Sequence, residues 1–473
     1  MEHELPNIVL HTELEKRNLA KLLQMELLQS EHKIVVLDDD PTGTQTVHDV
    51  SVYTRWDKQS VDQALAAPGR AFYILTNNRA RTAAEAEQVC CEIGETLATV
   101  SKEQNRSCIV ICRGDSTLRG HYPLETQTLR HIFEKSGARI DGEILFPFFQ
   151  EGGRFTLRGT HYVQQGPTLV PASDTEFAKD RTFGYSSSFL PQYIEEKTAG
   201  ECPARRVLHI PRELLFEDKI DLLQAQLGSC TDYRHVCVDA WEYADVAAFA
   251  VAFYRALAQG KRFLIQSAAS LVKVLAGIED KPLLLREEMT KSPPGGGVVI
   301  VGSHTKKTTR QLERLLTLKN VVPVPFRAFA AVEGTQELDR EVKRCVALQE
   351  QILGQGRTVV CYTEREEIPA EGLSREDALR QSVCIGEGVQ RLVAQLNTAP
   401  SFIIAKGGIT SSDIATKALG IDHAEVLGQI LPGVSVWRTP PGSRFPGIPY
   451  VVFPGNVGDE DALYQAVRKL TGR

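Results

Sequence analysis

Short apolar runs alternate with longer amphipathic stretches along most of this chain. An amphipathic stretch at residues 12–30 precedes the apolar run at 33–37, and later runs read AFYILT, SCIVICR and HVCVDA. Runs of four to six apolar residues suit buried strands, and amphipathic stretches of ten or more suit helices. Strands and helices in alternation predict an α/β fold in which a mostly parallel sheet is flanked by helices.

The alternating pattern breaks at TKSPPGGG, beyond the middle of the chain. Clustered proline and glycine disfavour both helix and strand, so residues 291–297 are predicted to be a linker, although a surface loop within one domain stays an alternative. A second alternating series begins at VVIVGS, and 473 residues exceed the length over which one core usually grows. We therefore expect two such α/β domains, residues 1–290, with a helical extension at 1–32, and residues 298–473.

Composition and charge narrow the classes of function. The chain has 42% hydrophobic residues, 24% charged residues and a formal net charge of -6. Nucleic-acid binding usually requires a basic surface. No apolar run reaches the roughly 20 residues that span a bilayer, and the first residues lack the pattern of a signal peptide. We expect a cytoplasmic protein with no nucleic-acid or membrane partner, and the ten cysteines contain no C-x-x-C pair that would suggest a metal site.

Three aspartates follow the first predicted strand directly. Asp38, Asp39 and Asp40 precede the turn residues 41–44, and ligands of open α/β sheets bind beyond the carboxyl ends of strands. Carboxylates there can accept hydrogen bonds from sugar hydroxyls, hold Mg²⁺, or accept the proton of an attacking hydroxyl. The alternative is that they cap the next turn, for which one aspartate is enough.

Two further polar segments in the first half follow apolar runs. Asp115, Ser116 and Arg119 come after SCIVICR, and Arg154 follows a glycine pair. A guanidinium suits a carboxylate, whereas aspartate and serine suit hydroxyls, so the mixture favours a polar sugar acid as ligand. A helix cap beside a surface arginine is the alternative for the first segment, and the glycine pair alone is a weak signal.

Glycine turns follow the strands of the second half. Gly302 and Ser303 end VVIVGS, and residues 407–410 (GGIT) end SFIIAK and open a helix. Free backbone N–H groups and hydroxyls in such turns suit nucleotide phosphates. The Walker A sequence G-x-x-x-x-G-K-[ST] does not occur in the chain, so a P-loop is excluded. A simple tight connection is the alternative for the glycine pair.

As a set, these segments resemble the four-carbon acid sugar kinases, a family long catalogued as a domain of unknown function. The chain matches seven family motifs in order: DDPTG at 39–43, DSTLRG at 115–120, GRFT at 153–156, GS at 302–303, GGIT at 407–410, PGV at 432–434 and GNVG at 455–458. The resemblance covers about residues 33–465. It departs from many members at Asp38, which is an additional aspartate, at residues 44–48, in the sequence GSHTKKTT, and in the N-terminal helix.

The resemblance implies an N-terminal domain that binds a sugar acid, a C-terminal domain that binds ATP, and an active site in the cleft between them. The γ-phosphate would pass to the terminal hydroxyl of a D-threonate, D-erythronate or 3-oxo-tetronate, with Mg²⁺ held by ligands that the sequence does not identify. The residues implied for the sugar acid are Asp39, Asp40, Asp115, Ser116, Arg119 and Arg154. Those implied for the nucleotide are Ser303, Gly407, Gly408, Ile409, Thr410, Gly433, Gly455 and Asn456.

Three of these residues are predicted to take part in catalysis. Arg119 would fix the substrate carboxylate, and Asp39 or Asp40 would orient the attacking hydroxyl and accept its proton. Two alternatives stay open: a Mg²⁺-dependent sugar-acid dehydratase or lyase that uses no nucleotide, and a non-catalytic sugar-acid sensor. A homodimer is possible, and the sequence does not decide the oligomeric state.

Overall fold

The structure is a computed structural model of the chain, and it divides into two compact units. Unit 1 comprises Met1–Val47 and Arg55–Asp280, and unit 2 comprises His48–Thr54 and Lys281–Arg473. The structure describes residues 3–4, 8–290, 295–365, 375–455 and 457–472. The division therefore lies near residue 280, and residues 291–294 of the predicted linker are outside the described residues.

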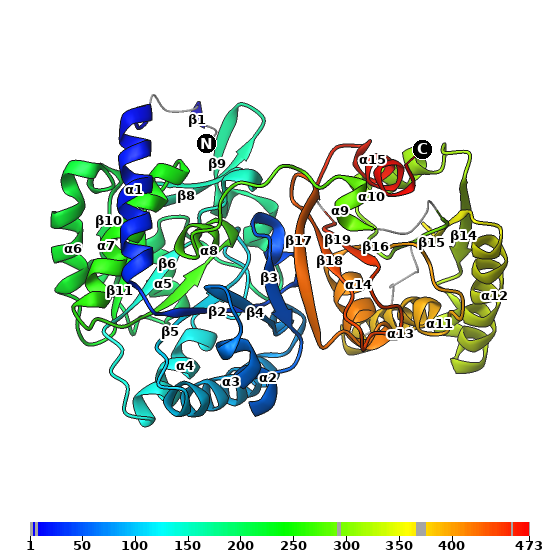
Figure 1. Ribbon diagram of the computed structural model, residues 1–473, viewed down its shortest axis with the longest axis horizontal. Helices are drawn as coiled ribbons and strands as arrows, with labels where there is room; N and C mark the ends of the chain where they lie inside the picture. The colour runs from blue at the N-terminus through cyan, green and yellow to red at the C-terminus, as the bar shows by residue number, and fades with distance from the viewer. Residues whose placement is uncertain (1–2, 5–7, 291–294, 366–374, 456, 473) are drawn as a thin grey trace. The chain divides into compact units, whose positions relative to one another are not determined.

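Unit 1 is built on a parallel sheet of seven strands (Figure 1). In spatial order these are β10 (Leu208–Ile210), β11 (Arg234–Val238), β6 (Gly142–Phe146), β12 (Phe263–Ser267), β5 (Cys108–Arg113), β2 (Lys33–Asp38) and β4 (Ala71–Leu75). All neighbouring pairs among them are parallel. The predicted α/β architecture with a parallel sheet is confirmed for this unit.

Helices cover both faces of this sheet. The helices are α1 (Glu13–Gln29), α2 (Lys58–Ala66), α3 (Ala83–Glu103), α4 (Leu124–Lys135), α5 (Leu190–Lys197), α6 (Ile220–Gly228), α7 (Tyr243–Ala258) and α8 (Ala269–Leu275). Helices α1 and α6 pack on α7 on one face, and α2 and α4 pack on α3 on the other (Figure 1). Helix α7 is buried on nearly all sides, in keeping with its Ala, Val and Phe content.

The predicted N-terminal helix is an integral part of unit 1. Helix α1 begins after Thr12, whose side chain forms a capping box with Glu15, and it buries Leu19 and Leu23. Just before it, His11 is buried, and its Nε2 lies 2.9 Å from Oδ1 of Asp245 on α7. The extension is therefore fixed to the domain by apolar packing and by a buried polar pair.

A small antiparallel sheet, which the sequence pattern did not predict, is added to unit 1. Its strands are β1 (His3–Glu4), β9 (Thr168–Pro171), β8 (Thr160–Gln165) and β7 (Arg154–Leu157). An isolated bridge between Thr156 and Ala240 joins β7 to the segment that follows β11. The strands of this small sheet are short and partly exposed, and they lack the continuous apolar runs of the central sheet.

Unit 2 has a mixed sheet of eight strands. In spatial order these are β3 (Val50–Tyr53), β17 (His423–Leu431), β18 (Val434–Arg438), β19 (Pro449–Phe453), β16 (Ile403–Lys406), β13 (Val298–Val301), β15 (Thr358–Thr363) and β14 (Val321–Phe326). The last five are parallel, and the first three join them in antiparallel fashion. Strand β3 belongs to this unit because it pairs with β17, although it precedes most of unit 1 in sequence.

The helices of unit 2 also lie on both faces of its sheet. They are α9 (Arg286–Met289), α10 (Lys306–Leu315), α11 (Ala330–Glu333), α12 (Thr335–Gly354), α13 (Arg375–Ala394), α14 (Gly408–Asp413) and α15 (Ala462–Thr471), and a π-helical turn continues α14 over Ile414–Ala418. Helices α10 and α15 lie on one face and α11 to α13 on the other (Figure 1). Apolar side chains of α10 and α15 form one core with those of the parallel strands.

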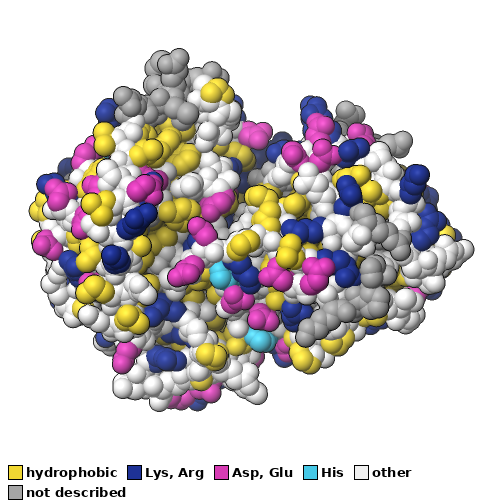
Figure 2. All heavy atoms as spheres, turned by 45° about the horizontal axis from the view of Figure 1, so that its top comes forward, with side chains coloured by type: hydrophobic (Ala, Val, Ile, Leu, Met, Phe, Trp, Pro, Cys, Tyr) yellow, Lys and Arg dark blue, Asp and Glu magenta, His cyan; other side chains and the backbone are white. Residues whose placement is uncertain are grey.

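On the face shown in Figure 2, the Lys and Arg side chains of the described residues are interspersed with Asp and Glu. No described helix has both the length and the apolar composition needed to cross a membrane.

Candidate functional site

The polar segments of unit 1 meet at one edge of its sheet. Strands β4, β2 and β5 are parallel neighbours, so the residues that follow them lie side by side. The acidic run follows β2, the short 3-10 helix Asn78–Ala80 follows β4, and the DSTLRG segment follows β5. The sequence predicted two of these three segments as parts of one site.

Asp38, the additional aspartate, points into the fold. It is 1% exposed, and its Oδ1 lies 3.1 Å from Nη1 of Arg113, which is also buried and is its register partner on β5. Burial raises the pKa of Asp38 above its ordinary value, although the charge of Arg113 opposes this shift. A Cβ added to Gly43 would lie 2.1 Å from Asp38 Oδ2, so the turn packs directly on this carboxylate. Asp38 therefore stabilises the turn from below.

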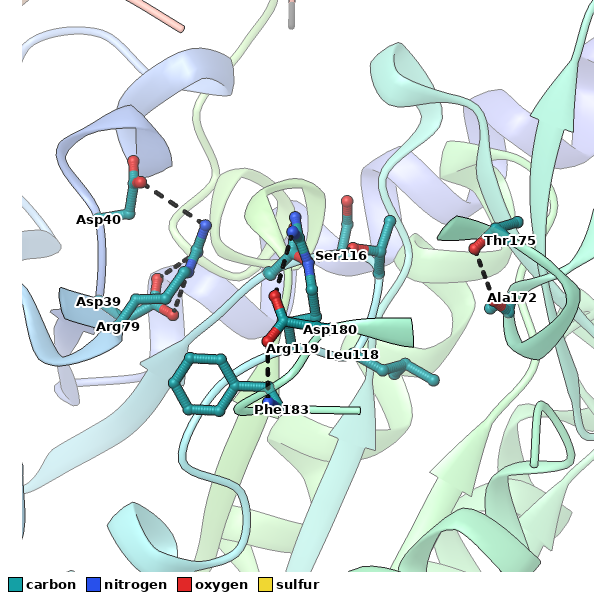
Figure 3. Close-up of polar contacts among 12 residues, drawn as sticks. Asp39, Asp40, Arg79, Ser116, Leu118, Arg119, Ala172, Thr175, Asp180 and Phe183 are labelled. Atoms are coloured by element: carbon teal, nitrogen blue, oxygen red, sulfur yellow. Dashed lines mark hydrogen bonds and ion pairs between the residues drawn. The ribbon is translucent and has the colours of Figure 1, made fainter. Parts of the chain in front are cut away.

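Asp39 is held by an arginine that the sequence did not single out. Arg79 donates to Asp39 through Nε, 3.0 Å from Oδ2, and through Nη2, 2.6 Å from Oδ1 (Figure 3). Burial raises the pKa of Asp39, and the Arg79 guanidinium is the largest influence in the opposite direction. A bidentate pair of this kind fixes both side chains in one geometry. Arg79 follows no recognisable motif, and only its position after an apolar strand could have drawn attention to it.

Asp40 is held less tightly than Asp39. Its Oδ1 accepts a hydrogen bond from the backbone N–H of Thr42 at 2.7 Å and caps the 3-10 helix Pro41–Thr46. Its Oδ2 lies 3.6 Å from Nη1 of Arg79, at the other end of the guanidinium that binds Asp39 (Figure 3). Capping, the alternative for this run, thus accounts for one oxygen atom of one aspartate.

Asp115 and Arg119 form a second ion pair beside the first. Arg119 Nε lies 2.7 Å from Asp115 Oδ2, and Thr117 Oγ1 donates to the same oxygen. Burial favours a raised pKa for Asp115, but the charges of Arg79 and Arg119 outweigh it and hold the pKa well below its usual range. Arg119 also faces Asp180, whose Oδ2 is 3.9 Å from Nη1 (Figure 3). Arg119 is therefore already paired with carboxylates of its own domain.

Ser116 is buried within the DSTLRG segment and is supported through its backbone. His161 Nε2, on β8, lies 2.7 Å from Ser116 O, and His161 Nδ1 lies 2.9 Å from Thr156 Oγ1. Burial lowers the pKa of His161 to about 4, so this imidazole is neutral near pH 7. A neutral imidazole that donates to a carbonyl and accepts from a hydroxyl has a structural role.

Arg154 differs from the other arginines of the site. It stands at the start of β7, and its Nη1 donates to the carbonyl of Gly152. Its Nε is buried without a hydrogen-bond partner, and among the described residues no carboxylate lies within ion-pairing distance of its guanidinium. Burial lowers the pKa of Arg154. Arg154 and Arg119 lie over the same ring, that of Phe177, at 5.9 and 4.9 Å from its centroid.

A small hollow opens beside the second ion pair. Its lining includes Asp115, Arg119 and Gly120 and reaches β12 at Gln266 and Ser267. Gln266 is buried, and its Oε1 has no hydrogen-bond partner among the described residues. The hollow is therefore lined by both charged and neutral polar groups. No motif indicated Gln266, because a single glutamine at a strand end carries no sequence signal.

The predicted nucleotide residues of unit 2 also converge. Strands β13, β16 and β19 are parallel neighbours, and Ser303, Gly407 and Gly455 follow them. A Cβ added to Gly455 would lie 3.3 Å from Ser303 Oγ, and one added to Gly407 would lie 3.5 Å from Ser303 Cβ. A Cβ on Gly302 would lie 2.3 Å from Thr410 Oγ1. A side chain would therefore clash at Gly302 and be tight at Gly455, whereas at Gly407 the positive φ of 121° is what favours glycine.

The remaining nucleotide residues have more varied positions. Gly408 begins α14, and Ile409 in its first turn is 67% exposed. Gly433 lies in the turn between β17 and β18, at the same edge of the sheet as Gly455, because Ser435 pairs with Val452. Asn456 lies outside the described residues.

One cluster of side chains in unit 1 has the composition of a metal site. In the described part of the chain, His11, Glu242 and Asp245 bring three potential ligand atoms together. However, Arg212 donates to Asp245 Oδ2 at 2.9 Å and to Glu242 Oε1 at 3.0 Å, so the two carboxylates are already neutralised. This cluster belongs to the anchor of α1 and does not fit Mg²⁺, which prefers oxygen ligands free of such pairing.

Each unit matches a known family model. Residues 34–275 match the family model described as a sugar-binding N-terminal domain, and residues 298–463 match that of a nucleotide-binding C-terminal domain. No curated protein matches the chain in sequence.

Solved structures of similar fold exist. A protein of Salmonella typhimurium LT2, provisionally called a tRNA synthase, is 18% identical, with a TM-score of 0.66 over 92% of this chain and 99% of its own. A Haemophilus influenzae protein of a family catalogued as a domain of unknown function is 18% identical, with a TM-score of 0.60 over 92% of this chain and all of its own.

A third solved structure is a domain of unknown function from Bordetella bronchiseptica, crystallised with bound citrate as a domain-swapped dimer. It is 19% identical, with a TM-score of 0.39 over 93% of this chain and 99% of its own. At such identities the solved structures speak for the fold, whereas the first family model alone covers more than half of the chain. On the two family models the chain belongs to the four-carbon acid sugar kinase family, with a sugar-binding N-terminal domain and a nucleotide-binding C-terminal domain.

Proposed function

We propose that the protein is an ATP-dependent kinase that phosphorylates the terminal hydroxyl of a four-carbon sugar acid of the threonate, erythronate or 3-oxo-tetronate type. The observation that carries this proposal is the arrangement of charges in the sugar-binding domain. Asp39, Asp40 and Asp115 are each in contact with an arginine, whereas Arg154 is a half-buried cation without a carboxylate partner among the described residues. A ligand that brings one carboxylate and several hydroxyls complements this set.

The contacts favour Arg154 as the group that binds the substrate carboxylate. The sequence suggested Arg119 for this role, but Arg119 already pairs with Asp115 at 2.7 Å. A half-buried arginine whose buried Nε has no acceptor gains most from a new anion, because the desolvation of that group is not yet compensated. We therefore assign Arg119 to the positioning of Asp115, whose carboxylate is kept ionised as an acceptor for substrate hydroxyls.

Asp40 is the better candidate for the residue that orients the attacking hydroxyl. Asp39 has both oxygens engaged by Arg79, whereas Asp40 Oδ2 only faces that arginine at 3.6 Å. The hydroxyl oxygen attacks the γ-phosphorus, the bond to the β–γ bridging oxygen breaks, and the hydroxyl proton passes to Asp40. Phosphoryl transfer has a loose, anionic transition state, so positioning and charge stabilisation supply most of the catalysis.

The glycine turns around Ser303 support the proposal that unit 2 binds the phosphates of ATP. Close approach of three backbone turns leaves N–H groups and hydroxyls to face an anion. Mg²⁺ would arrive bound to the nucleotide phosphates and neutralise part of their charge. Direct transfer requires the γ-phosphate of the nucleotide to meet the hydroxyl that unit 1 presents.

An ADP-release assay over a panel of four-carbon sugar acids tests the proposal. We expect turnover with at least one acid, and a loss of about a hundredfold or more in kcat for Asp40→Asn, in the range found for removal of a positioned base. Glu134→Gln, a change on the exposed surface of α4, is the matched control. Turnover that is unchanged in Asp40→Asn would contradict the role of this aspartate. Consumption of a sugar acid without ATP would instead favour the dehydratase or lyase.

Binding separates the kinase from both alternatives. A ligand that binds the native state stabilises it by RT ln(1 + [L]/Kd), so ATP and ADP should raise the thermal midpoint of the kinase. A lyase without a nucleotide would show no such shift. A sensor would be stabilised by the sugar acid but would release no ADP.

A further inference from the structure

Lys406 is a buried amine directly before Gly407, one of the residues of the proposed nucleotide site. It is the last residue of β16 and is 0% exposed. Its Nζ donates to the carbonyl oxygens of Pro454, at 2.5 Å, and Gly455, at 3.2 Å, and it lies 4.3 Å from the centroid of the Phe453 ring. An ammonium has three donors, and these two carbonyls take two of them.

Among the described residues, no compensating negative charge surrounds Lys406. Its register partners on β13 and β19 are Val301 and Phe453, which carry no ionisable group. In the described part of unit 2 no carboxylate lies within ion-pairing distance of Nζ, and Lys307 on α10 is the charged side chain that acts on it. Burial, followed by the like charge of Lys307, lowers the pKa of Lys406 to about 7. In most proteins a buried charge is paired, because desolvation of an unpaired ion is costly.

The position of Lys406 connects the amine to the turns that face the nucleotide. Gly407 follows Lys406 directly in the chain. The carbonyl oxygen of Gly455, which accepts from Lys406, also accepts from Thr308 Oγ1 at 3.2 Å. Thr308 Oγ1 also lies 3.1 Å from Ser303 Oγ, within hydrogen-bonding distance. The amine thus holds the Gly455 turn against the Ser303 turn from the buried side.

We propose that Lys406 is a positioning residue whose charge is completed by nucleotide binding: the phosphates draw a proton from solvent onto its amine, and the resulting ammonium holds the Gly455 turn in place. The inference rests on the proposed function, since it assumes that unit 2 binds a nucleotide. A phosphate dianion next to the turns supplies the negative charge that the protein itself does not. The proton is taken from the buffer, so nucleotide binding and proton uptake are linked.

Titration calorimetry of the full-length protein with MgADP measures this uptake. The binding enthalpy is compared at pH 8 in buffers of different ionisation enthalpy, such as HEPES and Tris. The phosphates of the free nucleotide are fully ionised at this pH, so they contribute no uptake. We expect between about half and one proton taken up per nucleotide bound, because Lys406 is then mostly neutral before binding.

Two variants assign the proton to Lys406. Lys406→Arg carries a permanent charge, so it should bind MgADP with an uptake near zero at pH 8. Lys469→Met removes another partly buried lysine of unit 2, which donates to the carbonyl of Ile430, and should leave the uptake unchanged. If Lys406→Arg does not fold, proton uptake on MgADP binding can still be measured on the wild type, which carries no substitution.

Three outcomes are distinguishable. Uptake in the wild type that persists in Lys469→Met and disappears in Lys406→Arg supports the inference. MgADP binding without uptake at pH 8 overturns it and leaves the proposed kinase intact. No MgADP binding, by calorimetry and by thermal shift, contradicts the nucleotide site itself and the inference with it.

Discussion

Arg79 binds Asp39 through two hydrogen bonds, with Nη2 2.6 Å from Oδ1 and Nε 3.0 Å from Oδ2, and its remaining terminal nitrogen faces Asp40. One guanidinium therefore organises the two aspartates that the family motif shares. The pair also explains why three consecutive carboxylates are tolerated at a strand end. Arg113 pairs with Asp38 and Arg79 pairs with Asp39. Asp40 accepts from the backbone N–H of Thr42 with one oxygen and faces Arg79 with the other.

Replacement of Arg79 by lysine should impair the sugar-acid site. A lysine cannot reproduce the two parallel hydrogen bonds to Asp39, and it leaves a buried carboxylate only partly compensated. We expect kcat/KM for the sugar acid to fall about a hundredfold or more, while MgADP binding is unchanged. Arg130→Lys, on the outer side of α4, is the matched control. Steady-state kinetics that are the same for both variants would contradict the organising role of Arg79.

Arg154 should determine the preference for an acid over a neutral polyol. If it binds the substrate carboxylate, the wild type discriminates threonate from threitol, and Arg154→Gln loses most of this discrimination. A charge-assisted hydrogen bond contributes about 1.5–3 kcal/mol, which corresponds to roughly a 10- to 100-fold rise in KM for the acid. Arg119→Gln should keep the preference for the acid while it lowers kcat. The opposite pattern would return the carboxylate to Arg119.

The additional aspartate should affect stability and leave substrate affinity unchanged. Asp38→Ala removes the partner of Arg113 and opens a gap beneath Gly43, so we expect a loss of about 3–5 kcal/mol in the free energy of unfolding. Asp38→Asn should cost less, because the amide keeps an acceptor for Arg113 and burial already favours the neutral carboxyl. Urea denaturation measures both. A changed KM for the sugar acid in a stable Asp38→Asn protein would show instead that Asp38 sets substrate preference.

Glu125 predicts a specific dependence of stability on pH. It is buried at the start of α4, accepts from Asn78 Nδ2 at 2.6 Å, and burial together with the charge of Asp39 raises its pKa to about 7. Between pH 4.5 and 7 the folded protein keeps a proton that the unfolded chain releases, so this group lowers stability as pH rises through that window. Relative to Glu125→Gln, the wild type should lose up to about 3 kcal/mol from pH 4.5 to pH 8. A stability difference between wild type and variant that does not change with pH would contradict the raised pKa.

A methyl group at Gly302 should weaken nucleotide binding selectively. The added Cβ would lie 2.3 Å from Thr410 Oγ1 and would push the GGIT turn away from Ser303. We expect about a tenfold or greater rise in the Kd for MgADP, in line with the 1–3 kcal/mol cost of overpacking, and little change in sugar-acid binding. Gly354→Ala is the control, because its Cβ would meet no atom within 4 Å at the end of α12. Equal effects of the two substitutions would argue against the convergence of these turns.

The sequence predicted the parts of the site that follow continuous apolar strands. Asp39 and Asp115 could be placed together because β2 and β5 read as buried strands, whose carboxyl ends meet in a parallel sheet. Ser303 and Gly407 were placed near each other for the same reason. The amphipathic stretch at 12–30 also predicted a helix, which the structure has at Glu13–Gln29.

The features that were missed depend on tertiary contacts between distant segments. Arg79 and Gln266 carry no motif, and their importance comes from the side chains that they meet. Strand β3 reads like a strand of the first sheet, and only its pairing with β17 assigns it to unit 2. The small sheet that presents Arg154 consists of short, partly exposed strands, for which hydrophobic periodicity is a weak guide.

Transfer of the γ-phosphate of ATP to a sugar acid can be observed by ³¹P NMR of the reaction mixture. With MgATP and a panel of threonate, erythronate and 3-oxo-tetronates, we expect a new phosphomonoester signal that grows in step with ADP for at least one acid. Omission of the sugar acid should abolish both signals. ATP that stays intact with every acid, or a sugar acid consumed without any phosphomonoester, would show that the protein is not a sugar-acid kinase.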